Sequence, residues 1–184
     1  MPEPWIGDVL SFWFEKLDQK ARFAKNDAVD AEITARFLPL YERLSTSLDI
    51  EHAVTFPQRA LATVIVLDQF PRNMFRGSPR AFAADPLALS LAREVVARRV
   101  DVRVAPIERR VFFYLPFEHS ENIADQQRSI ELMRTLGAPE FDKYAEAHRV
   151  IIERFGRFPH RNSVLGRLST PEELEFLKGP NSSF

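Results

Sequence analysis

The chain has 184 residues, of which 45% are hydrophobic and 28% charged, and its formal net charge is −1. This length and balance are ordinary for one folded domain and exclude a wholly disordered protein. The near-neutral charge argues against nucleic acid as a partner. The absence of cysteine excludes disulfides, thiolate catalysis and zinc–thiolate sites.

The first apolar run covers residues 5–17 and is interrupted by Asp8, Ser11, Glu15 and Lys16. A signal peptide or a membrane span would not be interrupted by polar residues in this way. We therefore expect a cytoplasmic protein with no membrane partner.

Apolar residues recur at helical spacing along the chain, and no alternating strand pattern is present. The first predicted helix covers residues 4–17 and the second covers residues 29–44, where Pro39 should kink or split it. Residues 60–67 are apolar all round, which favours a helix buried on all sides, ended by Pro71.

In the second half of the chain, Asp85 followed by Pro86 predicts a helix cap with proline at the first helical position. A helix over residues 106–115 should stop at Pro116, and Ser120 should cap the helix that follows it. These predictions place each helix start at a short polar side chain.

The clearest predicted helix covers residues 139–155 and is stopped by Gly156, and a capping box at Thr170 and Glu173 starts a short final helix. Short turns rich in Pro and Gly join these segments, which is typical of stacked antiparallel helical pairs. We expect an all-α fold, with one domain over residues 1–178 and a frayed tail over residues 179–184.

The first of three polar turns covers residues 68–77 and follows the apolar helix. Asp68 lies in the last turn of that helix, where a carboxylate opposes the helix dipole, and Arg72 and Arg76 are within reach to compensate it. Asn73 lies between them. Two interpretations remain open for this turn: it is pinned by an ion pair, or it binds a ligand.

The second turn places Glu118, His119 and Glu121 together after another apolar helix. Glu121 is explained as an acid in the first turn of the next helix. Glu118 beside His119 is more suggestive, because a carboxylate can orient an imidazole or raise its pKa.

The third turn follows the clearest helix and contains Arg157, His160, Arg161 and Asn162. Its FPHRN segment echoes the FPRN segment of residues 70–73. Two similar turns would present two guanidinium groups and two amides to one cavity.

His148 falls on the apolar face of the helix over residues 139–155. A lone histidine on such a face is more often a satisfied core residue than a ligand group, and both interpretations stay open. Glu153 lies about 140° around the helix from it, so these two cannot chelate one ion. With no H-E-x-x-H spacing present, we expect no metal and no other cofactor.

The segments LDQFPRN, LPFEHSE and FGRFPHRN, at residues 67–73, 115–121 and 155–162, resemble the signature segments of a bacterial family called domain of unknown function 924. Residues 9–14 and 165–173 fit the same family. The resemblance implies a tetratricopeptide-like superhelical arrangement of helices and implies no activity. The chain shows no tetratricopeptide repeat consensus, so the likeness concerns only how helices are arranged.

Three hypotheses follow for the polar turns. In the first, they converge on a pocket for a small anion, carboxylate or phosphate, in which His119 or His160 is the acid or base of a hydrolase-like or transferase-like reaction and Glu118 or Asp68 orients it. Its binding residues would be Arg72, Asn73, Arg76, His148, Arg157, Arg161 and Asn162. Whether catalysis occurs, and in which oligomeric state, is left open.

In the second hypothesis, stacked helical pairs form a peptide-binding module without catalysis that holds a peptide carboxylate. In the third, the turns are a buried structural network that locks helix ends together. A ligand site predicts guanidinium groups that no carboxylate pairs, whereas a structural network predicts that every arginine is paired.

Overall fold

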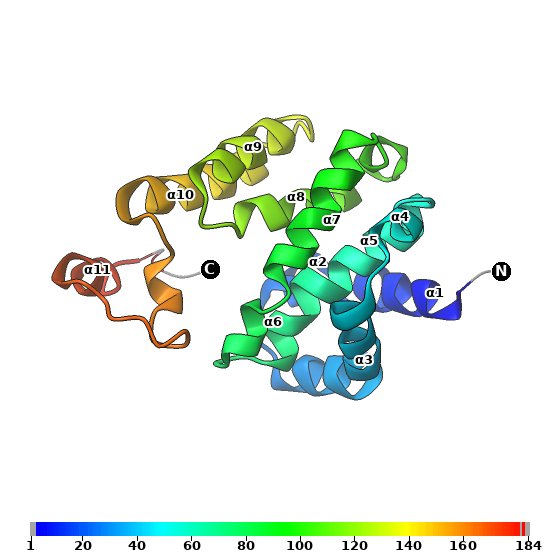
Figure 1. Cartoon of the computed structure of the whole chain (residues 1–184), viewed down its shortest axis with the longest axis horizontal. Helices are drawn as coiled ribbons and strands as arrows, with labels where there is room; N and C mark the ends of the chain where they lie inside the picture. Colours follow the sequence, from blue (N-terminus) through cyan, green and yellow to red (C-terminus); the bar gives the residue numbers. More distant parts are fainter. Residues whose placement is uncertain (1–2, 181, 183–184) are drawn as a thin grey trace.

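The structure is a computed structural model that describes residues 3–180 and residue 182. Within those residues the chain is all-helical and contains no strand, which confirms the expected fold class. Figure 1 shows α1 and α11 at opposite ends of the longest dimension. Of the expected frayed tail, residues 181, 183 and 184 lie outside the described residues, and Ser182 donates to the Leu177 carbonyl at 3.2 Å.

The first half of the chain forms helices that surround one buried helical run. The elements before that run are α1 (Pro4–Ser11), the π-helical turn η1 (Phe12–Lys16), α2 (Gln19–Phe23), α3 (Asp27–Ser47) and α4 (Ile50–Ala53). Pro39 lies inside α3, which continues through it as one helix, so the proline does not split the segment.

The buried run consists of α5 (Pro57–Val64), the π-helical turn η2 (Ile65–Gln69) and α6 (Phe70–Met74). Every residue from 59 to 71 is buried, which confirms the prediction of a helix covered on all sides. The prediction that Pro71 ends this helix was wrong. The π turn closes with the Phe70 amide donating to the Ile65 carbonyl, and Pro71 then lies in the first turn of α6, where its missing N–H is not needed.

The second half continues the helical pattern with shorter connecting turns. Its elements are η3 (Pro79–Phe82), α7 (Asp85–Ala97), η4 (Asp101–Arg103), η5 (Ile107–Arg110), α8 (Val111–Glu118), α9 (Ile123–Arg134), α10 (Pro139–Phe155), η6 (Pro159–Arg161) and α11 (Pro171–Phe176).

Among the expected boundaries in this half, those at Pro116 and Ser120 were wrong, and the one at Thr170 was confirmed. Pro116 lies inside α8, which continues until the His119 amide donates to the Leu115 carbonyl at 2.9 Å. Asn122, and not Ser120, caps α9, because its side chain accepts from the Ala124 amide. The capping box that begins α11 has both expected hydrogen bonds.

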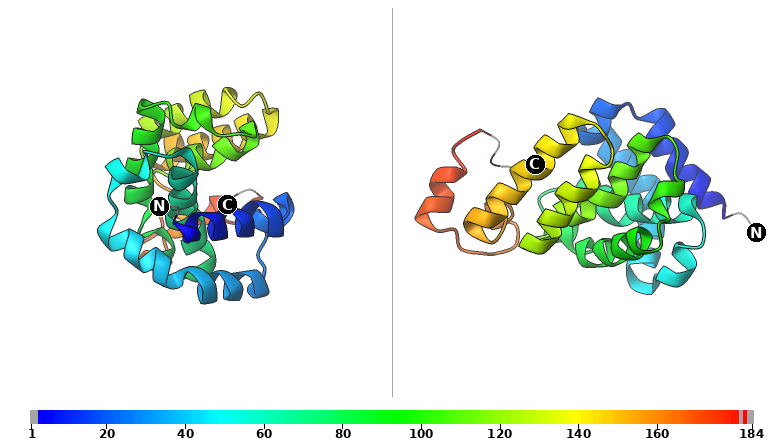
Figure 2. Two further views of the ribbon diagram at one scale, coloured as in Figure 1. Left: turned by 90° about the vertical axis from the view of Figure 1, so that its right-hand side faces the viewer. Right: turned by 90° about the horizontal axis from the view of Figure 1, so that it is seen from above.

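The described residues form one large apolar core and one small one. The large core takes residues from α1 to the start of α10, and its side chains include Trp13, Phe70 and Phe113. The small core consists of Ile151, Ile152 and Phe158, with Phe155 and Phe176 packed against it. Figure 2 shows α11 standing at one end of the molecule, beyond α10. The third polar turn therefore rests on the small core, and the first two rest on the large one.

Helices that are neighbours in the sequence pack on each other through this half: α7 on α8, α8 on α9, and α9 on α10. The short link between α9 and α10 makes these two helices a hairpin. No helix within the described residues has both the length and the apolar character needed to cross a membrane.

Gly156 ends α10 with a φ angle of 68°, and nothing lies within 4 Å of the position where a Cβ would stand. We expect Gly156→Ala to lower the free energy of unfolding by about 1 kcal/mol, because only glycine adopts this backbone conformation without strain. The matched control is Gly7→Ala in the exposed part of α1, which also meets no neighbour and should stabilise slightly. Chemical denaturation measures both, and equal effects of the two substitutions would contradict the prediction.

Candidate functional site

Asp68 lies in the π turn η2, is fully buried and links the first polar turn to the second. Its Oδ1 accepts a hydrogen bond from Nδ1 of His119 at 2.7 Å, and its Oδ2 accepts one from Nε2 of Gln69 at 2.5 Å. The Asp68 backbone carbonyl accepts from Nη1 of Arg72. Both carboxylate oxygens are thus used, and the side chain is held in one orientation. A π turn is often found at functional sites.

The bond to Asp68 fixes the tautomer of His119, because Nδ1 must carry the proton that it donates to a carboxylate. Burial alone would raise the pKa of Asp68, but the charges of His119 and Arg72 and the hydrogen bonds to it lower that pKa below its ordinary value. Burial and the charge of Arg72 lower the pKa of His119. At neutral pH the pair is therefore a carboxylate and a neutral imidazole whose Nε2 is a base, and 13% of the His119 side chain is exposed.

Asp85 joins the first polar turn to the third. Its two oxygens accept hydrogen bonds from Nη1 and Nη2 of Arg72 at 3.0 and 3.1 Å, which is a bidentate ion pair. Nη1 of Arg161 donates to Asp85 Oδ2 at the longer distance of 3.3 Å. One carboxylate thus accepts hydrogen bonds from two guanidinium groups, two shorter bonds from Arg72 and one longer bond from Arg161.

Arg161 is 7% exposed and packs against the rings of Phe82 and Phe158, with its Cζ 4.5 and 4.6 Å from their centroids. Its bond to Asp85 is the one side-chain hydrogen bond that it makes within the described residues, and its buried Nε has no partner there. Burial and the charge of Arg72 lower the pKa of Arg161 to about 10, so the group still carries its charge at neutral pH. A buried guanidinium with so few partners is under-satisfied.

Glu118 and His148 lie beside the Asp68–His119 pair. Glu118 is 3% exposed, and its Oε1 lies 3.2 Å from Nδ1 of His148, which also donates to the Tyr144 carbonyl at 2.9 Å. Burial, reinforced by the charge of Asp68, raises the pKa of Glu118 to about 8. The group is therefore a neutral carboxylic acid at pH 7, and its Oε2 has no hydrogen-bond partner among the described residues.

His148 and His160, the two other histidines near the polar turns, are also neutral at pH 7. His148 is buried, as its place on the apolar face predicted, and burial lowers its pKa to about 3. Burial, followed by the charge of Arg161, lowers the pKa of His160 to about 4. The His119 and His148 ring centroids are 6.5 Å apart.

Four of the predicted binding residues lie outside this cluster. Asn73 and Arg76 both donate to Asp30 of α3, at distances of 2.7 to 3.0 Å. In the third turn, Arg157 makes a bidentate pair with Glu173 at 2.7 and 2.8 Å, and Asn162 donates to the same carboxylate at 3.3 Å. These four side chains hold helix ends together, as the structural-network hypothesis predicted for every arginine.

The second and third turns are also tied through Glu121. Its carboxylate accepts hydrogen bonds from the Phe158 amide at 2.8 Å and from Arg167 at 2.7 and 2.9 Å. The side chains that converge are therefore Asp68, Arg72, Glu118, His119, His148 and Arg161.

Sequence reasoning missed Asp85, Asp30, Glu173 and Phe82, each of which contacts a predicted residue. Asp85 was interpreted as a helix cap, but Ala84 is the N-cap of α7 and Asp85 turns its side chain to the arginines. In the sequence, the one indication that Asp85 has another role is an acidic residue before Pro86, and a helix cap explains that pattern equally well.

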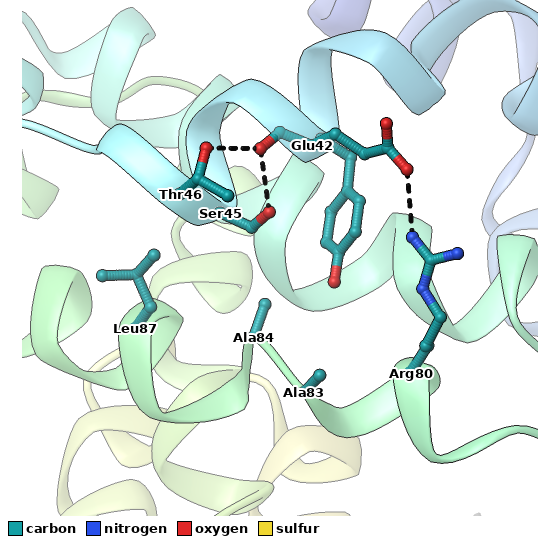
Figure 3. A pocket seen from close by; sticks show the side chains of 8 residues that line it. Glu42, Ser45, Thr46, Arg80, Ala83, Ala84 and Leu87 are labelled. Atoms are coloured by element: carbon teal, nitrogen blue, oxygen red, sulfur yellow. Dashed lines mark hydrogen bonds and ion pairs between the residues drawn. The ribbon is translucent and has the colours of Figure 1, made fainter.

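The described residues contain no group of three or more His, Asp or Glu side chains arranged to hold a metal ion. Two surface hollows lie elsewhere. One, of about 500 Å³, lies between α3 and the start of α7 and is spanned by the ion pair of Glu42 and Arg80 at 3.1 Å (Figure 3). The other, of about 430 Å³, is lined by residues that include Glu121 and Gly156, at the edges of the second and third turns.

The fold and the cluster define an all-helical protein with an Asp–His pair and two arginines that share one carboxylate. The chain belongs to the family described as bacterial protein of unknown function (DUF924), whose model matches residues 9–181. It is also similar to a solved structure of a protein of unknown function, ATU0120, from Agrobacterium tumefaciens. The two chains are 41% identical, with a TM-score of 0.89 over 96% of this chain and 98% of that one. None of the curated proteins compared with the chain matches it.

The raised pKa of Glu118 predicts a specific pH dependence of stability. The folded state keeps a proton on Glu118 that the unfolded chain releases above its ordinary pKa near 4.5, so this residue's contribution falls as pH rises from about 4.5 to about 8. Glu118→Gln keeps the shape of the neutral acid and removes this loss. We expect the difference in melting temperature, variant minus wild type, to become more positive between pH 5 and pH 9.

The control is Glu175→Gln, which removes an exposed carboxylate near the end of the chain. Its difference in melting temperature should stay nearly constant over the same pH range. A Glu118→Gln difference that is equally flat would show that Glu118 is ionised in the folded protein at neutral pH.

Proposed function

We propose that the protein binds a small anion, carboxylate or phosphate, at Arg161, beside an Asp68–His119 pair able to transfer a proton. The observation that carries the proposal is the under-satisfied Arg161 guanidinium. Three of the four arginines in the polar turns have a short ion pair of their own, at 2.7 to 3.0 Å. Among the described residues, the one ion pair of Arg161 is the 3.3 Å contact with a carboxylate that Arg72 already occupies.

An anion at Arg161 would offset the free-energy cost of burying a guanidinium whose N–H donors lack partners. A buried charged donor without partners loses its hydration and gains no hydrogen bond in return. Two ligand oxygens facing Nε and one Nη would supply those bonds in the planar geometry that guanidinium prefers. The aromatic rings of Phe82 and Phe158 lower the local polarity, which strengthens such a charge-assisted bond.

The Asp68–His119 pair supports acid–base chemistry at the same site. A buried carboxylate that holds Nδ1–H leaves Nε2 as the atom that accepts or returns a proton. We assign His119 as the acid or base and Asp68 as its positioning residue, in a hydrolase-like or transferase-like reaction. Glu118, which keeps its proton to higher pH, is a further proton donor beside it. His160, the alternative acid or base, packs against Phe158, with the two ring centroids 5.6 Å apart.

The finer features of the architecture belong to the same proposal: one domain over residues 1–178, tetratricopeptide-like stacking of the helical pairs, and a cytoplasmic location. The sequential packing of α7, α8, α9 and α10 supports the stacking. A peptide-binding module has less support. The larger hollow would be its groove, but the Glu42–Arg80 ion pair crosses that hollow (Figure 3).

The proposal is tested by adding sodium phosphate or sodium acetate to the protein at constant ionic strength and measuring binding by calorimetry and by the melting temperature. We expect at least one of these anions to raise the melting temperature of the wild type, because a ligand that binds only the folded state stabilises it. Arg161→Gln should abolish that rise.

The matched control is Arg128→Gln, the same change at an exposed arginine on α9 that pairs with Glu131. It should leave the anion response intact. Arg161→Gln should itself cost little stability, since the lost guanidinium has few partners. A strong loss of stability in that variant, with no anion effect on the wild type, would instead assign Arg161 to the structural network.

A further inference from the structure

We infer that the site accepts a planar monocarboxylate with an apolar body and discriminates against phosphate and other dianions. This inference rests on the proposed function and names the ligand class of the same site. It follows from how Asp85 divides its charge between two arginines, and from the two rings that flank Arg161.

The first step is that the guanidinium of Arg72 already has a carboxylate partner. Its Nη1 donates to Asp85 Oδ1 and to the Asp68 carbonyl, and its Nη2 donates to Asp85 Oδ2. The pair is bidentate, and its two charges cancel. A ligand therefore meets one available guanidinium, that of Arg161, and not the pair of guanidiniums that the sequence places in the two turns.

The second step is a count of charges around Arg161. Arg72, Arg161 and Arg167 are positive, and Asp68, Asp85 and Glu121 are negative, so the six groups sum to zero when His119 is neutral. A monoanion adds one negative charge next to the under-satisfied Arg161. A dianion would add two negative charges near two buried or half-buried carboxylates, and this repulsion is strong where the polarity is low.

The third step concerns shape. The rings of Phe82 and Phe158 both pack against the Arg161 guanidinium, so a ligand must approach along its N–H edge. A carboxylate is planar and matches this edge with two parallel hydrogen bonds. Phe158 is fully buried and Phe82 is partly exposed, so a carbon body attached to the carboxylate can cover apolar ring surface at Phe82.

Asp85 also shows which group the site is built to hold, because it presents the same carboxylate to Arg161. From Arg161 its Oδ2 accepts one bond of 3.3 Å, since the orientation of the carboxylate is set by the better contact with Arg72. A ligand carboxylate without that second partner can approach Arg161 in the ideal bidentate arrangement. Asp85 is therefore a specificity-determining residue that keeps Arg72 from serving a second ligand charge.

The experiment compares sodium benzoate, acetate, phosphate and sulfate by calorimetry at equal ionic strength and at pH 8, where phosphate is largely a dianion. We expect benzoate to bind more tightly than acetate, and phosphate and sulfate to bind at least about tenfold more weakly than benzoate, a ratio equivalent to about 1.4 kcal/mol. Phosphate or sulfate binding as tightly as benzoate would overturn this inference and leave the proposed function standing. A wild type that binds none of the four anions would defeat the proposed function itself.

Two variants test the roles of Asp85 and of the guanidinium plane. Asp85→Asn frees Arg72, so phosphate affinity should rise about tenfold or more while benzoate affinity changes less. Arg161→Lys keeps the charge and loses the planar fork, so the preference for benzoate over phosphate should shrink. Thermal unfolding confirms that each variant is folded. If Asp85→Asn is unfolded, Arg161→Lys alone decides, and an unchanged benzoate preference in it would contradict the inference.

Discussion

The arrangement of polar groups depends on one buried carboxylate, that of Asp68, which has no exposure to solvent. Such a group is stable only when both oxygens and the charge are compensated, and here His119, Gln69 and Arg72 do this together. The requirement ties α8 to the π turn, since His119 is the residue that follows α8. Removing any one partner would leave a buried charge incompletely satisfied, so the helix ends around Asp68 are constrained as a group.

The polar turns combine two kinds of interaction that look alike in the sequence. Arg76 and Arg157 pair with acids from distant parts of the chain and act as clamps between helix ends. Arg161 has a similar sequence environment but faces a carboxylate already engaged by Arg72. The structural-network and ligand-site hypotheses are therefore not exclusive. The structural network pairs Arg72, Arg76 and Arg157 of the polar turns, and the N–H donors of Arg161 that lack a partner are those that a ligand would use.

Much of the helical architecture follows from local patterns, because apolar spacing and glycine or capping signals act within a few residues. Gly156 and the buried position of His148 were predicted correctly for this reason. Proline was misleading at both Pro71 and Pro116. Pro71 lies in the first turn of α6, where an N–H is not needed, and Pro116 lies inside α8, which loses one backbone bond there and ends two residues later. The partners of the arginines could not be predicted, since Asp85 is 76 residues from Arg161 and only the fold brings them together.

The small core around Ile151, Ile152 and Phe158 gives the two sides of the polar cluster unequal resistance to perturbation. Asp68 and His119 are anchored on the large core, whereas Arg161 follows a segment held by few apolar side chains and by the ion pairs of Glu121 with Arg167 and of Arg157 with Glu173. Salt screens such pairs where they are partly exposed, but it scarcely weakens apolar packing. Rising ionic strength therefore destabilises the Arg161 side of the cluster before the side formed by Asp68 and His119. Hydrogen exchange in residues 156–178 would accelerate, while the amides around Asp68 would stay protected.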